Sequence, residues 1–80
     1  MSEQEKSQHQ PEIKNLVDGI FEEMNRVRGI IKEYEQLENG AGKLAASFMN
    51  IDLKFAELSL RRSDVLMMLA AYGKLKSWEL

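Results

Sequence analysis

The sequence predicts an all-α protein, a helical hairpin in which one long helix packs against two shorter helices and which dimerises into a bundle. Apolar residues recur in steps of four and three over most of the chain, as they do on the packing face of a helix. Asn39-Gly40-Ala41-Gly42 and Ser63-Asp64 interrupt this spacing, as turns between helices do. The chain has 80 residues and no cysteine, so no disulfide supplements the small core of a single domain. We therefore expect self-association.

The first ten residues are polar and contain no apolar residue after Met1. Because such a segment buries nothing that would offset the entropy of ordering its backbone, we predict a disordered tail over residues 1–10. A single helical domain then covers residues 11–80. Its first helix is predicted over residues 11–38, starting at Pro11 because proline is tolerated in the first turn of a helix.

The apolar residues of this first helix alternate steps of four and three, as in a coiled-coil seam. Leu16, Ile30 and Leu37 add a further column, so the apolar face is wider than a two-stranded seam requires. In a chain too short to cover this face comfortably, the seam indicates a homodimer contact, to which the second helix also contributes. The predicted dimer interface consists of Val17, Ile20, Met24, Val27 and Ile31.

The second helix is predicted over residues 43–61, after a tight turn in which Asn39 and Gly40 tolerate a left-handed backbone. A second apolar seam follows the same spacing, and additional apolar residues broaden it, so this helix is expected to be more buried than the first. The seam consists of Leu44, Phe48, Ile51, Phe55 and Leu58, and the residues that broaden it are Ala45, Ala46, Met49, Leu53, Ala56 and Leu60.

The third helix is predicted over residues 64–76, after a break at Ser63-Asp64, where the aspartate can cap the next helix. At 1.5 Å per residue the second and third helices together roughly match the first, so they can fold back along it. Tyr72, Leu75 and Trp78 are predicted to bind a partner protein, because aromatic side chains at a helix end can fill a pocket. The alternative is that these three residues complete the homodimer.

The sequence shows no catalytic, cofactor-binding or metal-binding constellation, and we expect neither an enzyme nor a bound cofactor. His9 is the single histidine, and no nucleophile or fixed carboxylate is predicted near it. Glu33, Glu35 and Glu38 spread around a helix axis instead of converging on one point. Gly40-Ala41-Gly42-Lys43 lacks both the spacing of a phosphate-binding loop and the strand that precedes one.

The charge balance makes nucleic acid an unfavoured partner. Eleven Lys and Arg oppose thirteen Asp and Glu, which gives a net charge of −2 and no broad positive field. The opposing hypothesis is a nucleic-acid-binding regulator that uses Arg26, Arg28, Arg61 and Arg62. No stretch reaches the ~20 apolar residues that span a bilayer, and the first residues lack the pattern of a signal peptide, so we expect a cytoplasmic protein with no membrane contact.

Part of the sequence resembles small helical proteins of tailed phages and prophages. The resemblance lies in the run from Glu33 to Gly42 (EYEQLENGAG), followed by an apolar helix and Asp64-Val65-Leu66-Met67-Met68, and it covers about residues 30–76. The chain departs from this pattern at Ser63, where glycine is expected. The resemblance implies an accessory protein that binds and inhibits a bacterial host or defence protein, and it transfers no functional residue.

The expected function is therefore binding to another protein, as an inhibitor or adaptor, with a structural homo-oligomer as the alternative.

Overall fold

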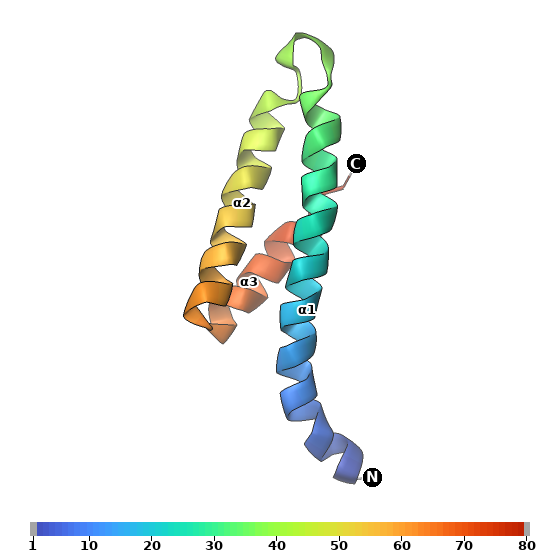
Figure 1. Ribbon diagram of the computed structural model, residues 1–80, viewed down its shortest axis with the longest axis vertical. Coiled ribbons are helices and arrows are strands. Elements are labelled where there is room, and N and C mark those ends of the chain that lie inside the picture. The colour runs from blue at the N-terminus through green and yellow to red at the C-terminus, as the bar shows by residue number, and fades with distance from the viewer. Residues whose placement is uncertain (1, 80) are drawn as a thin grey trace.

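The computed structural model describes residues 2–79 and the side chains of residues 15–79. It contains three α-helices and a short 3-10 helix: α1 (Ser2–Glu35), η1 (Glu38–Gly40), α2 (Lys43–Arg62) and α3 (Val65–Lys76). The predicted all-α fold, with one long helix and two shorter ones, is confirmed. α2 runs back alongside α1, and α3 returns from the end of α2 toward the middle of α1 (Figure 1). Each helix contacts the other two.

The bounds of α1 differ from the predicted ones at both ends. The helix includes residues 2–10, where the sequence predicts a tail, so Pro11 lies inside it. Glutamate, glutamine and lysine are good helix formers, which allows a polar segment to continue a helix without burying apolar surface. At the other end α1 stops at Glu35, and Leu37 takes an extended conformation that leads into η1.

The predicted tight turn between the first two helices is confirmed. Asn39 and Gly40 both have positive φ, at 62° and 70°. The backbone N–H of Ala41 donates to the carbonyl of Glu38 at 3.2 Å, which closes the turn. The backbone of Gly42 lies very close to α1. A Cβ atom at this position would lie 2.3 Å from the backbone oxygen of Tyr34. The turn therefore depends on the absence of a side chain at Gly42.

The predicted break between the second and third helices is also confirmed. Ser63 takes a left-handed conformation with φ 53°, and its N–H donates to the carbonyl of Leu60 at 3.1 Å. The next N–H, of Asp64, donates to the carbonyl of Ser59 at 3.2 Å, a pairing that commonly closes helices. Asp64 Oδ1 accepts from the N–H of Met67 at 3.2 Å and caps α3.

All three helices contribute to one apolar core. The α1 seam supplies its centre, which corrects the predicted dimer interface. Four of those five side chains are buried inside a single chain and Val17 packs against them, so a second copy cannot reach the seam while the bundle is folded. The buried core consists of Ile20, Met24, Val27, Ile30, Ile31, Ala46, Met49, Leu53, Ala56, Met68, Ala71 and Leu75.

Candidate functional site

The outer face of α2 carries a line of large apolar side chains, here called the α2 stripe: Leu44, Phe48, Ile51, Phe55 and Leu58. Leu44 is 69% exposed, Ile51 58% and Phe48 50%, and the other two are partly buried. The sequence analysis expects the second helix to be more buried than the first, yet three of the five residues of its seam are exposed. At 3.6 residues per turn, steps of four and three place these residues along one side of the helix.

The opposite side of α2 faces the core with residues that the sequence analysis treated only as broadening the seam. Ala46, Met49, Leu53 and Ala56 are buried there, against both α1 and α3. Two small alanines suit a helix that must fit against two neighbours, because interiors are close-packed. α2 is therefore apolar on two sides, and the side with the bulkier residues faces outward.

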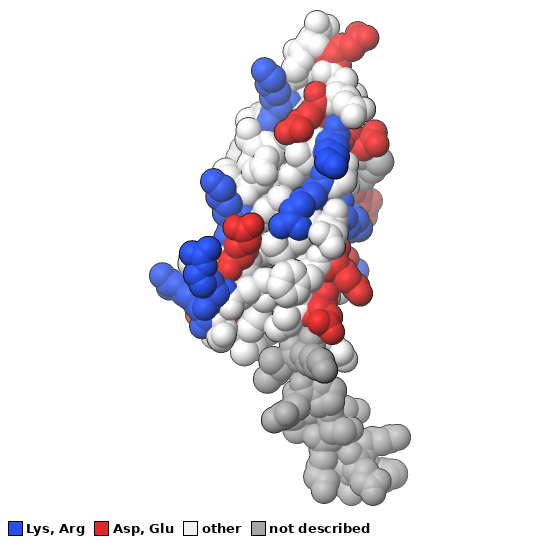
Figure 2. Space-filling model, in the orientation of Figure 1, with Lys and Arg blue, Asp and Glu red and all other residues white. Residues whose placement is uncertain are grey.

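Basic side chains border the α2 stripe, and we call Lys54, Arg61, Arg62 and Lys74 the cationic rim. Lys54 and Arg61 each follow a stripe residue by three positions, which places them along one edge of the stripe. Lys74 reaches from α3 to the other edge, with Nζ 5.6 Å from the centre of the Phe55 ring. Figure 2 shows basic side chains along the outer edge of α2 with an acidic side chain among them, whereas both charge signs are mixed over α1.

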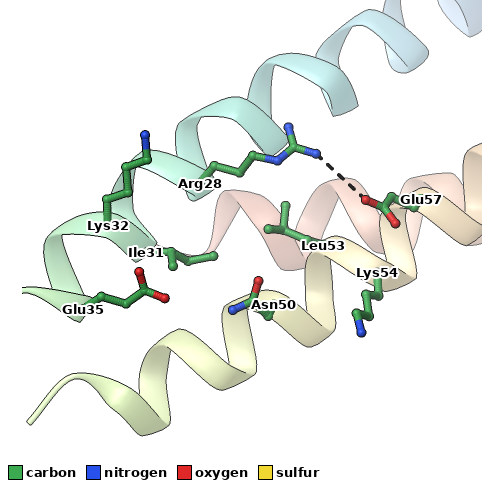
Figure 3. A pocket seen from close by; sticks show the side chains of 8 residues that line it. All are labelled: Arg28, Ile31, Lys32, Glu35, Asn50, Leu53, Lys54 and Glu57. Atoms are coloured by element: carbon green, nitrogen blue, oxygen red, sulfur yellow. Dashed lines mark ion pairs between the residues drawn. The ribbon is translucent and has the colours of Figure 1, made fainter. Parts of the chain in front are cut away.

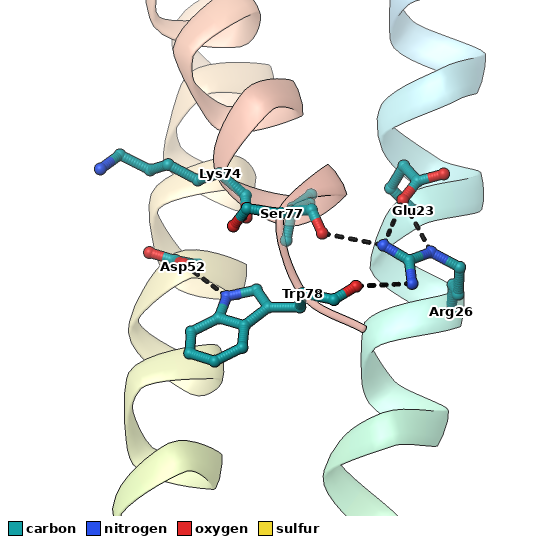
Figure 4. Close-up of polar contacts among 7 residues, drawn as sticks. Glu23, Arg26, Asp52, Lys74, Ser77 and Trp78 are labelled. Carbon is teal, nitrogen blue, oxygen red and sulfur yellow. Dashed lines mark hydrogen bonds and ion pairs between the residues drawn. The ribbon is translucent and has the colours of Figure 1, made fainter. Parts of the chain in front are cut away.

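The three predicted partner-binding residues complete the bundle of the single chain instead. Leu75 is fully buried in the core, and the Tyr72 ring lies 3.1 Å from the position of a Cβ at Gly19. The indole Nε1 of Trp78 donates to Asp52 Oδ2 at 2.8 Å, which holds Trp78 against α2 (Figure 4). These residues are therefore not the exposed anchors that the sequence analysis proposed, and the bundle also uses them without a second copy.

Arg26 closes the C-terminal end of α3, a contact that the sequence analysis did not find. Its Nη1 donates to the carbonyl of Trp78 at 2.8 Å and its Nη2 to the carbonyl of Leu75 at 2.9 Å (Figure 4). Glu23 Oε1 accepts from Nε of the same guanidinium at 2.8 Å and holds it in place. A cation at a helix C-terminus satisfies carbonyls that have no partner within the helix.

The four arginines of the nucleic-acid hypothesis are not brought together as one surface. Arg26 contacts α3, whereas Arg28 faces α2, where it lies 3.9 Å from Glu57. Within the described residues, Arg61 and Arg62 form no ion pair, and they belong to the cationic rim at the far end of α2. Arg26 and Arg28 thus contact different helices, apart from Arg61 and Arg62.

An open groove of about 370 Å³ lies between α1 and α2 (Figure 3). Its lining mixes both charge signs around two apolar side chains, and Nδ2 of Asn50 donates to the Ala46 carbonyl of its own helix. A second hollow next to the groove includes Glu35, Lys43 and Asn50. In small-molecule sites, several polar groups point toward one position. The polar groups of these two hollows do not. The groove is lined by Arg28, Ile31, Lys32, Glu35, Asn50, Leu53, Lys54 and Glu57.

Among the described side chains, no group of three or more His, Cys, Asp or Glu residues is placed to hold a metal ion. His9 lies outside them, whereas Glu33, Glu35 and Glu38 are exposed. The described helices include none with the length and apolar character needed to cross a bilayer.

No protein-family model, curated protein or solved structure matches the chain.

Proposed function

We propose that this protein is a non-enzymatic protein-binding module that acts stoichiometrically, as an inhibitor or adaptor, through the α2 stripe. The observation that carries the proposal is the position of the stripe: large apolar side chains line the outer side of α2, where Leu44, Phe48 and Ile51 are exposed and Phe55 packs only partly against the core. The proposal places the protein in the cytoplasm. The resemblance to phage proteins would make a bacterial host or defence protein the target.

The stripe supports this proposal because its exposure is costly. Apolar surface left in water forgoes about 25 cal/mol for each Å² that burial would remove. The core already includes residues from all three helices, so the stripe is not needed to close it. Contiguous exposed apolar surface with a polar border is typical of protein interaction sites. The free energy that a partner gains on binding therefore rises with the apolar area it covers, which favours binding to the α2 stripe.

The test is affinity capture from a bacterial lysate with matched leucine variants. Leu44 lies in the stripe, whereas Leu66 lies on α3 and is 77% exposed, so Leu44→Lys and Leu66→Lys add the same charge at two exposed leucines. We expect wild type and Leu66→Lys to capture the same protein in a fixed molar ratio and Leu44→Lys to lose it, with all three equally helical by circular dichroism. Capture that survives Leu44→Lys, or a wild type that captures nothing, would contradict the proposal.

A further inference from the structure

We propose that the occupant of the α2 stripe is an acidic amphipathic helix of another protein. This inference rests on the proposed function, because it names the chemistry of the partner that the stripe binds.

The shape of the stripe suits one helix. Its residues from Leu44 to Leu58 span about 21 Å along α2 at 1.5 Å per residue. They follow steps of four and three, the spacing with which one helix offers apolar side chains to another. A partner helix with apolar residues at the same intervals would cover the stripe along its whole length, which is a common mode of peptide recognition.

The charges beside the stripe determine which residues are favoured next to the apolar face of the partner helix. Lys54 and Arg61 lie seven residues apart on one edge, and Arg62 continues the line of the stripe four residues after Leu58. Lys74 provides a cation at the opposite edge, above Phe55. Residues that border the apolar seam of paired helices set partner choice through their charges. Aspartate or glutamate beside the apolar face of the partner would meet a cation on either edge.

Two acidic residues of α2 must be counted against this selection. Asp52 keeps its negative charge, because the Trp78 indole that donates to it at 2.8 Å is neutral, whereas Glu57 lies 3.9 Å from Arg28, on the side of α2 that faces α1. In the part of the chain whose side chains are described, neither Lys54 nor Arg61 has an ion-pair partner. The edge of the stripe that carries Lys54 and Arg61 is therefore locally positive in a chain whose net charge is −2, whereas Asp52 offsets part of the charge of Lys74 at the opposite edge.

The same rim disfavours a second copy of the chain. Two copies with parallel α2 helices would bring both copies of Arg62 together at the end of the shared seam. Antiparallel copies centred on Ile51 would place both copies of Lys54 on the same edge near the middle of a symmetric interface. Like charges next to each other oppose association. A nucleic acid would pair with the rim but would leave the apolar side chains between the cations uncovered.

The experiment uses synthetic helical peptides that carry one identical leucine face and differ only in their flanking residues, which are glutamate, glutamine or lysine. Fluorescence anisotropy measures their binding to the full chain. We expect the glutamate peptide to bind about tenfold more tightly than the glutamine peptide, and the lysine peptide to bind most weakly. The difference should shrink as salt rises to about 0.5 M, because the rim is exposed to solvent.

Charge reversal on the protein supplies the matched control. The double variant Lys54→Glu with Arg61→Glu should invert the order of the three peptides, while Lys32→Glu, an exposed lysine on α1, should preserve it. All three positions of change are exposed, so we expect circular dichroism to show that the helices are retained.

Several results would overturn the inference. They are equal binding of the three peptides, no binding of the glutamate peptide, tighter binding of a DNA duplex than of that peptide, or a wild-type dimer in sedimentation equilibrium that Ile51→Lys dissociates. If this inference alone fails, the lysate capture is still lost in Leu44→Lys. If the proposed function fails, that capture survives the substitution.

Discussion

Gly42 lies at the closest approach between the turn and α1. A Cβ atom there would sit 2.3 Å from the Tyr34 carbonyl oxygen, and a backbone atom cannot move aside as a side chain can. We expect Gly42→Ala to lower the free energy of unfolding by about 2 kcal/mol in urea titrations. Gly29→Ala is the control, because nothing lies within 4 Å of its added methyl group and alanine is the better helix former, so a gain of about 1 kcal/mol is expected. Similar losses in both variants would contradict this account of the turn.

Ser63 holds a backbone conformation that suits glycine better. Its φ of 53° lies in the left-handed region, which costs a residue with a Cβ atom about 1–2 kcal/mol. Ser63→Gly should therefore raise the free energy of unfolding by about 1 kcal/mol, since both backbone hydrogen bonds at the corner are kept. Thermal unfolding would measure the gain. A lower melting temperature would show that the serine side chain contributes a contact of its own.

At the scale of the elements, hydrogen bonds from Arg26 join the C-terminal end of α3 to α1. Replacing Arg26 with methionine keeps an unbranched apolar side chain but removes the guanidinium that donates to the carbonyls of Leu75 and Trp78. Because the Arg26 side chain is 39% exposed, the expected loss is only about 1 kcal/mol. The fluorescence of Trp78, the single tryptophan, should shift to longer wavelength as water reaches the indole.

Arg28→Met is the matched control for Arg26. Its ion pair with Glu57 is long, at 3.9 Å, and about half exposed on both sides, so such a pair contributes little. We expect Arg28→Met to leave the Trp78 emission unchanged. An equal shift in the two variants would mean that Arg26 does not hold the end of α3 specifically.

The breaks between helices could be predicted from the sequence because they depend on local chemistry. Asn39 and Gly40 tolerate positive φ, and Asp64 caps the helix that follows it, whatever lies elsewhere in the fold. The packing face of α1 was predictable as well, since one side of that helix is clearly more apolar, but the sequence analysis assigned this face to a second copy instead of to α2 and α3. The start of α1 at Ser2 was not predictable, because helix propensity in a polar segment competes with backbone entropy.

The outward face of α2 could not be predicted from spacing. Met49 and Ile51 are both apolar, and each belongs to a regular helical line, so periodicity assigns neither of them to the core. The choice depends on how closely α1 and α3 approach the two alanines of the inner line. The position of Trp78 depends in the same way on Asp52, which lies 26 residues earlier in the chain.

At the scale of the whole molecule, one chain encloses the α1 seam that the sequence assigns to a homodimer. The α2 stripe, which the proposal offers to a partner, lies on the opposite side of α2, and other exposed apolar side chains lie on α1 and α3. The central claim is therefore the rotation of this helix, with Met49 turned inward and Ile51 outward. The binding proposal and the partner chemistry both depend on it.

Chemical denaturation of Met49→Lys and Ile51→Lys tests that rotation most directly. The two substitutions place the same charge two residues apart on α2, at a side chain that is fully buried and at one that is 58% exposed. We expect Met49→Lys to cost about 4 kcal/mol or more, enough to unfold so small a domain, and Ile51→Lys to change the free energy of unfolding by only about 0.5 kcal/mol. Unfolding by Ile51→Lys, with Met49→Lys tolerated, would contradict the account.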